Sequence, residues 1–172
     1  MTSIRYGLKL SQQATMEQLR AVWQLTDQAG FDHCWNMDHL ATLGPRQDGD
    51  IFEAWTMLAG MAALTSRTRL GCSVAGNTYR HPAVLAKAAV TVDHLSGGRL
   101  EFGIGSAWAE NEHTMLGLPF GTARDRADWL DESCQVIRSL WTEERTTFAG
   151  AHYQLVHAIA EPKPVQRPHP PI

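Results

Sequence analysis

The strongest constraint on this chain is a repeating order of a short apolar strand, a loop and an amphipathic helix. Strands are predicted at residues 4–10, 33–37, 70–74 and 100–104, each followed by a segment whose apolar residues have helical spacing. Parallel strands need a long crossover connection, usually a helix, so this alternation predicts an α/β fold with a parallel sheet. Topology alone leaves open both a closed barrel and an open doubly wound sheet.

Local signals mark where several helices begin and end. Thr15 and Gln18 have the spacing of a capping box, in which two side chains satisfy free amides at a helix start. Gly30 suits the left-handed cap that closes the same helix. Pro82 suits the first turn of a later helix, where its missing N–H has no partner to lose.

Three further segments complete the expected order of elements. One helix is expected to start at the Asp50-x-x-Glu53 motif, and a long one from about Thr122. Residues 146–155 predict a small surface hairpin. The proline-rich residues 161–172 can continue neither a helix nor a central strand, so we expect an extended connector there.

Composition and charge argue against several classes of function. The 172 residues are 44% hydrophobic, which is enough for the core of one domain. A formal net charge of −3 offers no basic surface for a phosphate backbone, so no nucleic-acid partner is expected. No apolar stretch approaches the roughly 18 residues of a membrane span, and the first residues lack the apolar core of a signal peptide. We therefore expect no membrane partner.

The cysteines and histidines limit the cellular compartment and the metal chemistry. Cys34, Cys72 and Cys134 are odd in number and far apart, which predicts no disulfide framework and suits a reducing, cytoplasmic location. His33, Cys34 and His39 could in principle bind one metal ion. Adjacent residues in a strand point to opposite faces, however, so no metal site is expected.

Functional residues are expected in the loops that follow the strands, because the chemistry of parallel α/β folds gathers at the C-terminal ends of the strands. These loops contain Asp38 and His39, then residues 73–77, then residues 105–112. They are the part of the sequence in which a site should be sought.

One rival interpretation makes Ser73 a nucleophile. Residues 71–75 come within one residue of the nucleophile elbow of α/β-hydrolases, in which a serine sits on a sharp turn between a strand and a helix. That elbow needs its helix directly after the serine, whereas residues 77–81 intervene before Pro82. A hydrolase is therefore the less favoured alternative.

Several motifs occur in one order along the chain: Tyr79-Arg80-His81-Pro82, residues 93–105, Trp108-x3-Glu112-x4-Gly117 and the proline-rich segment 162–172. Together they resemble the luciferase-like monooxygenase family, the relatives of bacterial luciferase, and in particular its F420-dependent oxidoreductase branch. The resemblance implies a (β/α)8 TIM barrel of which only the first four βα units are present. Residues 1–160 would then be the N-terminal half of the barrel, and residues 161–172 a connector towards a missing fifth strand.

The resemblance also implies roles for residues in the strand-end loops. His39 matches a histidine that deazaflavin-dependent members place against the ring system, where an imidazole can act as acid or base. Asp38 beside it is a candidate cofactor-binding residue. Ser73 and Val74 match a bulged, often cis, peptide that supports one face of the ring. An ordinary strand end is the alternative for that pair.

The loop after the fourth predicted strand supplies the remaining candidates. Gly105 and Ala107 are small enough to let a planar ring approach the backbone, and Asn111 matches a position that hydrogen-bonds the cofactor. Glu110 is a second candidate catalytic residue, with a solvated surface charge as the equal alternative. Glu112 is expected to be a solvated or structural charge on a short helix.

The expected activity follows from the family. Its members use flavin or deazaflavin, so we expect an oxidoreductase or monooxygenase that moves hydride to or from a small organic substrate, or oxygenates it. Coenzyme F420 is the expected cofactor, with FMN as the alternative. The expected assembly is a homo-oligomer. A second hypothesis is a non-catalytic half-barrel that binds cofactor weakly or acts only as an oligomer.

Overall fold

The computed structural model describes residues 4–45 and 48–172. Residues 1–3, which formed part of the stretch judged to lack a signal peptide, lie outside the described residues. Four parallel strands form one sheet in the order β1-β2-β3-β4. Their bounds are β1 Gly7–Lys9, β2 His33–Asn36, β3 Arg69–Gly76 and β4 Leu100–Gly105. The prediction of a parallel α/β sheet is confirmed.

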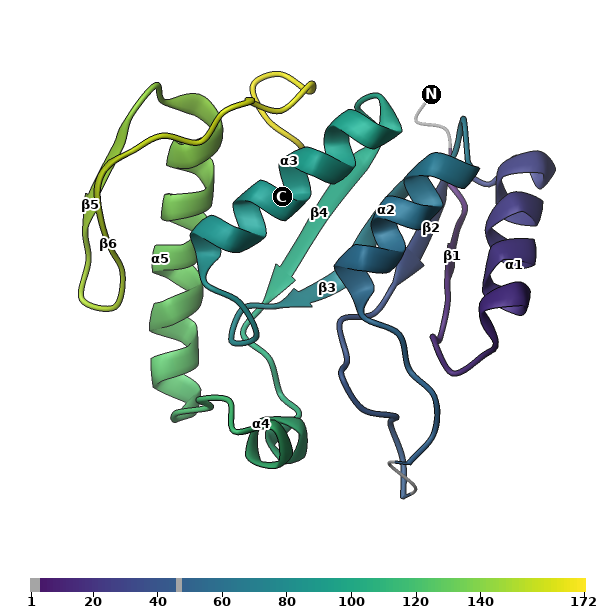
Figure 1. Ribbon diagram of the computed structural model, residues 1–172, viewed down its shortest axis with the longest axis horizontal. Helices are drawn as coiled ribbons and strands as arrows, with labels where there is room; N and C mark the ends of the chain where they lie inside the picture. The colour runs from purple at the N-terminus through teal and green to yellow at the C-terminus, as the bar shows by residue number, and fades with distance from the viewer. Residues whose placement is uncertain (1–3, 46–47) are drawn as a thin grey trace.

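Helices connect these strands and cover the sheet (Figure 1). The crossover helices are α1 Met16–Ala29, α2 Ala54–Leu64 and α3 Pro82–Ser96. A short helix, α4 Glu110–Leu116, and a long one, α5 Ala123–Thr142, follow β4. Figure 1 shows α5 beside α3, away from β1. The chain then forms a two-stranded antiparallel hairpin of β5 Thr146–Ala149 and β6 Gln154–Ala158, as predicted.

The helix ends confirm most of the sequence signals. Thr15 and Gln18 form a capping box at the start of α1, and Gly30 closes the helix with a φ of 89°. Pro82 stands in the first turn of α3. The expected helix start at Asp50 is wrong: α2 begins at Ala54, because the Glu53 side chain accepts the free N–H groups of the first turn and acts as the N-cap.

The first strand is shorter than predicted. Residues 4–10 were expected to be extended, but pairing runs only from Gly7 to Lys9, because the partner strand β2 begins at His33. Just before the pairing starts, the N–H of Tyr6 donates to the carboxylate of Asp32 at 2.8 Å. A side chain therefore satisfies the Tyr6 N–H, whereas the Tyr6 carbonyl accepts the backbone N–H of Asp32 at 2.8 Å.

The apolar core lies between the sheet and its helices. Leu70 and Cys72 of β3 and Leu100 and Phe102 of β4 alternate with residues of the opposite sheet face, and all four are at most 2% exposed. Trp141 of α5 closes the core, with its ring edge against Phe102 and its indole N–H donating to a carbonyl of α3 at 3.1 Å. The long helix α5 is thus fixed to the sheet.

Charged side chains bind the loops together at the N-terminal ends of the strands. The Asp27 carboxylate accepts the backbone N–H groups of the loop before β3, at residues 66, 67 and 68. The Arg99 guanidinium donates to backbone carbonyls of Ala62, Thr65, Thr68 and Ser96 and to the Thr65 hydroxyl. Arg69 pairs with Glu101 on the neighbouring strand. These charges hold backbone in place.

The proline-rich tail is folded back onto the domain. Residues 161–172 contain neither helix nor strand, and their Glu161–Pro162 and Arg167–Pro168 bonds are cis. Lys163 donates to carbonyls at the end of α5, and Asp93 of α3 accepts the N–H groups of Val165 and Gln166. The Pro171 carbonyl accepts from Phe102 of β4 at 2.9 Å.

None of the helices among the described residues is long and apolar enough to cross a bilayer.

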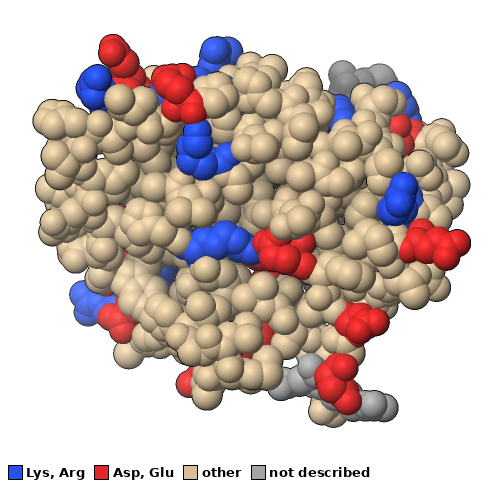
Figure 2. All heavy atoms as spheres, in the orientation of Figure 1, with Lys and Arg blue, Asp and Glu red and all other residues tan. Residues whose placement is uncertain are grey.

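Charged side chains are scattered on the face shown in Figure 2. Lysine and arginine side chains occur there singly or beside acidic ones, and other residue types cover most of the surface.

Candidate functional site

A cavity of about 420 Å³ opens where β1, β2, β3 and β4 end. Its walls come from the end of each strand and the loop behind it. The lining residues are Lys9, Met37, Asp38, His39, Ser73, Val74, Gly76, Tyr79, Gly105, Ser106, Ala107 and Trp108. Six of the eight predicted site residues are in this set, so one cavity collects candidates from loops that are far apart in the sequence.

Glu110 and Asn111 are the two candidates outside this set. Both lie at the start of α4, and both are exposed. The lining of the cavity ends at Trp108, two residues before Glu110 and three before Asn111. The structure therefore does not bring these side chains into the cavity, and their catalytic and cofactor-binding roles stay predictions.

The Ser73–Val74 peptide bond is cis, as the resemblance implied. The pairing of β3 with β4 shifts register between Cys72 and Ala75, so the strand is irregular at this bond. Val74 is 49% exposed, although it stands within a strand. A Cβ atom placed on Gly105 of β4 would lie only 2.7 Å from the Val74 Cγ2 atom, so the absence of a side chain at Gly105 leaves room for the irregular strand.

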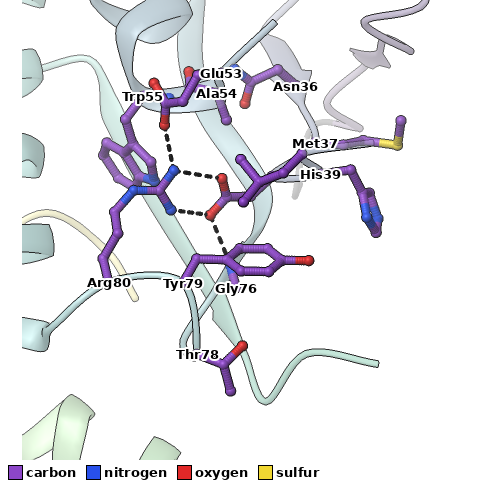
Figure 3. A network of polar contacts seen from close by, with 12 residues as sticks. Asn36, Met37, His39, Glu53, Ala54, Trp55, Gly76, Thr78, Tyr79 and Arg80 are labelled. Atoms are coloured by element: carbon purple, nitrogen blue, oxygen red, sulfur yellow. Dashed lines mark hydrogen bonds and ion pairs between the residues drawn. The ribbon is translucent and has the colours of Figure 1, made fainter. Parts of the chain in front are cut away.

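An ion-pair network forms around the buried Asp38 carboxylate, which lines the cavity (Figure 3). The Arg80 guanidinium makes two hydrogen bonds to the Asp38 carboxylate, at 2.6 and 2.9 Å, and also pairs with Glu53. The N–H of Gly76 donates to the same Asp38 carboxylate at 2.9 Å. Two parallel N–H···O bonds fix direction as well as charge. Asp38 thus ties the loop after β2 to the end of β3 and the start of α3.

Burial and charge act against each other in this network. Burial raises the pKa of the Asp38 carboxyl, and the hydrogen bonds from Arg80 oppose the rise. Burial alone would lower the pKa of Arg80, but its two carboxylate partners raise it above its usual value. Burial also raises the pKa of Glu53, yet hydrogen bonds from the first turn of α2, together with Arg80, bring it below the usual range. Arg80 therefore stays charged.

Glu112 is not the solvated charge that the sequence suggested. Its side chain is 1% exposed, and three donors and the His39 ring surround the carboxylate. The N–H groups of Leu40 and Ala41 donate to Oε1 at 3.2 and 3.0 Å, and the Tyr79 hydroxyl donates to Oε2. His39 Nδ1 lies 3.2 Å from both carboxylate oxygens. The short helix α4 therefore holds the loop that carries His39.

His39 stands between this carboxylate and the cavity. Its side chain is 13% exposed, and the edge of its ring meets Trp108 with 5.4 Å between ring centroids. Nδ1 is taken by Glu112, whereas Nε2 has no hydrogen-bond partner among the described residues. The predicted acid–base candidate thus faces the cavity with one nitrogen free.

Sequence reasoning missed Lys9, Arg80, Tyr79 and Glu112 as parts of this site. Lys9 ends β1 and lines the cavity, and within residues 4–45 and 48–172 its ammonium has neither an ion-pair nor a hydrogen-bond partner. Asp38 and Glu112, by contrast, are each compensated by donors. The position of Lys9 at the C-terminal end of a strand is the one signal that could have identified it.

The rival interpretations find little support in this geometry. Ser73 lies inside β3, and the next helix begins only at Pro82, so the strand-to-helix turn of a hydrolase elbow is not formed there. Among the residues that the structure describes, no group of three or more histidine, cysteine or acidic side chains is placed to hold a metal ion.

Comparison with known proteins identifies the family. Residues 1–172 match the model of the luciferase-like monooxygenases. The chain belongs to this family. It is 40% identical over 166 residues to the F420-dependent glucose-6-phosphate dehydrogenase of Kineococcus radiotolerans. That alignment covers 92% of this chain and 48% of the dehydrogenase. It is 35% identical over 157 residues to the pyrimidine monooxygenase RutA of Stutzerimonas stutzeri, and this alignment covers 87% of this chain and 42% of RutA. The chain thus spans about half the length of the curated relatives it matches.

Solved structures of similar fold agree with this assignment. The monooxygenase RslO1 from Streptomyces bottropensis superposes with a TM-score of 0.82 at 26% identity, covering 97% of this chain and 52% of that one. An F420-dependent secondary alcohol dehydrogenase, solved with an F420–acetone adduct, gives a TM-score of 0.83 at 23% identity. The superposition covers 95% of this chain and 50% of the dehydrogenase. At that identity the second likeness concerns the fold alone.

Proposed function

We propose that this chain forms the ring-binding part of a luciferase-like oxidoreductase that uses coenzyme F420, with FMN as the alternative, and acts on a small organic substrate. The observation that carries the proposal is the cavity at the strand ends, which brings His39, the Ser73–Val74 segment and Gly105 together. Relatives named as F420-dependent and as monooxygenase enzymes support the same reading.

The cavity suits a planar, partly polar ring. Gly105 and Ala107 leave one wall without bulky side chains, and Val74 and Trp108 supply apolar surface. Lys9 offers a positive charge to a ring that becomes anionic on reduction. Asp38 is already paired with Arg80, so it does not place a bare negative charge beside such a ring. The residues present therefore fit a flavin or deazaflavin ring.

Each residue then has a physical task. The bound cofactor would supply hydride transfer or, for a flavin, oxygen activation. The Ser73–Val74 segment would support one face of the ring, and backbone at Gly105 would lie against it. Trp108 would restrict the access of water. His39 Nε2 would accept or return a proton on a substrate hydroxyl within hydrogen-bonding reach.

We further propose that the four βα units form half of a (β/α)8 barrel and that residues 161–172 lead towards its next strand. The Pro171 carbonyl, bonded to Phe102 on the outer edge of β4, lies where a neighbouring parallel strand would pair. The length covered in the relatives supports this reading. A homo-oligomer remains the expected assembly.

Parallel titration with coenzyme F420 and FMN tests the cofactor, with binding followed by the change in cofactor fluorescence. Gly105→Val serves as the blocking variant, because the new side chain would collide with Val74. Gly60→Ala on α2 is the matched control, since a Cβ there makes only an ordinary 3.9 Å contact with Trp23. Circular dichroism confirms that both variants are folded.

The expected result is saturable binding of coenzyme F420, tighter than that of FMN, which is lost in Gly105→Val and kept in Gly60→Ala. Tighter binding of FMN would reverse the cofactor assignment while keeping the site. Binding of neither cofactor by the folded protein would contradict the proposal and favour a non-catalytic half-barrel.

A further inference from the structure

The hydrogen bonds around Glu112 determine which nitrogen of His39 carries a proton. The N–H groups of Leu40 and Ala41 can only donate, and both point at Oε1 of Glu112. The Tyr79 hydroxyl donates to Oε2. Three donors therefore converge on a carboxylate that is 1% exposed, and each of them requires its oxygens as acceptors.

A carboxylate that acts as an acceptor in this position leaves His39 one arrangement. Nδ1 lies 3.2 Å from both Oε1 and Oε2 of Glu112, and an ionised carboxylate can only accept. Nδ1 must therefore carry the hydrogen. In the neutral ring Nε2 then holds the lone pair, and it is the nitrogen that has no partner among the described residues.

We propose that Glu112 and Tyr79 are positioning residues for His39, and that they keep its neutral ring in the Nδ1–H tautomer with Nε2 free to accept a proton in the cavity. Glu112 sets the tautomer. Tyr79 holds the second carboxylate oxygen, and burial together with the bond to Glu112 raises the pKa of its hydroxyl, so it stays a donor. The inference deepens the proposed function and rests on it only for the catalytic use of His39.

The other charged groups near His39 do not replace Glu112. Asp38, the preceding residue, is bound by Arg80 and by the N–H of Gly76. Lys9 lines the same cavity from β1 and is a donor, so it cannot accept from an imidazole N–H. Trp108 meets the His39 ring through an edge contact. Glu112 is thus the acceptor that the structure provides for Nδ1.

Nitrogen-15 NMR of the histidine side chains tests the proposal in the protein itself, without any cofactor. The His39 signals are identified by their loss in His39→Asn, and spectra are recorded at a pH at which the ring is neutral. The expected spectrum shows a protonated Nδ1 and an unprotonated Nε2. A protonated Nε2 in the wild-type protein would overturn the proposal.

Glu112→Gln is the decisive variant. Its amide oxygen can still accept from Leu40 and Ala41, but an amide nitrogen, which is a donor, would replace Oε2 beside His39 Nδ1 and compete for the ring nitrogen's lone pair, so the fraction of the Nδ1–H tautomer should fall. Turnover with the preferred cofactor should fall by at least about tenfold in kcat, with a smaller change in KM. Glu144→Gln, an exposed glutamate beyond α5, is the matched control and should change neither readout.

Tyr79→Phe separates the two positioning residues. It keeps the Glu112 carboxylate, so the Nδ1–H tautomer should persist. The loss of the Tyr79 bond loosens the carboxylate, so kcat should fall, but by less than in Glu112→Gln. Tyr6→Phe, an exposed tyrosine before β1, is its control. An unchanged tautomer in folded Glu112→Gln would contradict the proposal.

The two proposals fail in different ways. If the tautomer is as expected but neither coenzyme F420 nor FMN binds, the positioning of His39 stands and the proposed function does not. If a cofactor binds and turns over while His39 carries its hydrogen on Nε2, the proposed function stands and the role of Glu112 does not.

Discussion

The two ends of the parallel sheet contain similar charged side chains but use them differently. At the N-terminal ends, Asp27 and Arg99 direct their hydrogen bonds at loop backbone, so each charge serves to fix the chain. At the C-terminal ends, Asp38 and Glu112 also hold loops, but the residues of these loops border a cavity. In that cavity, His39 Nε2 and the Lys9 ammonium have no hydrogen-bond partner among the described residues. One end of the sheet thus uses its charges on backbone alone, whereas the other leaves two polar groups unpaired at a cavity, as the proposed function requires.

The largest effect is expected from Arg80→Met. The change leaves the Asp38 carboxylate buried without its partner, which costs about 3–5 kcal/mol of unfolding free energy in comparable cases. Burial then raises the pKa of Asp38 further, and because the ionised form opposes folding, the variant should regain stability as the pH falls through that raised pKa. Urea unfolding at several pH values measures both effects.

The exposed Arg124 provides the control for this change. Its side chain is 90% exposed and pairs weakly with Asp128 at 3.9 Å, so Arg124→Met should change stability by less than about 1 kcal/mol. Equal losses in Arg80→Met and Arg124→Met would mean that the buried network contributes no more than a surface pair.

Arg99→Met should give the second-largest loss, at the opposite end of the sheet. It removes donors to four backbone carbonyls and one hydroxyl, and we expect a loss of about 2–4 kcal/mol. Affinity for the cofactor should be unchanged in the folded protein. If Arg99→Met lost as much cofactor affinity as the cavity variant Gly105→Val, the two ends of the sheet would not differ in their effect on binding.

Asp27→Asn should have a smaller, pH-dependent effect. Burial opposes ionisation, but the N–H donors from residues 66–68 outweigh it and lower the pKa of Asp27 below its usual range. The carboxylate therefore stabilises the fold at neutral pH, by about 1 kcal/mol, and this contribution is lost as the pH falls below about 4. The stability difference between the variant and the wild type should narrow in acid, with Asp128→Asn as the exposed control. A constant difference would contradict the assignment.

Lys9→Met should have the smallest effect on stability and a clear one on binding. Its ammonium has no partner among the described residues, so the unfolding free energy should change by less than about 0.5 kcal/mol. If the charge serves an anionic ring or substrate, affinity for the reduced cofactor should fall about tenfold, equivalent to about 1.4 kcal/mol. The Arg124→Met variant controls for net charge. Unchanged affinity would place Lys9 outside the binding site.

The sequence predicted those parts of the fold that depend on neighbouring residues. The capping box at Thr15, the glycine cap at Gly30, the proline at Pro82 and the hairpin at 146–155 each follow from a few adjacent positions. The start of α2 was misplaced because Asp50 and Glu53 are both reasonable caps, and only the structure shows which carboxylate meets the free amides.

The site could be predicted only in part, because its contacts join distant segments. The strand-end rule and the family motifs located His39, Ser73 and Gly105 correctly at one cavity. The burial of Glu112 depends on partners 33 and 73 residues away, and the Arg80–Asp38 pair spans 42 residues. No local pattern encodes such pairings.

Gly103 and Gly105 allow β4 to lie close to the irregular part of β3. Added Cβ atoms there would lie 2.4 Å from the Cys72 carbonyl oxygen and 2.7 Å from Val74, so β4 approaches β3 only because these positions are bare. A single methyl group at Gly105 would therefore force Val74 to move. Because both residues line the cavity, a substitution at position 105 has to be designed together with one at position 74.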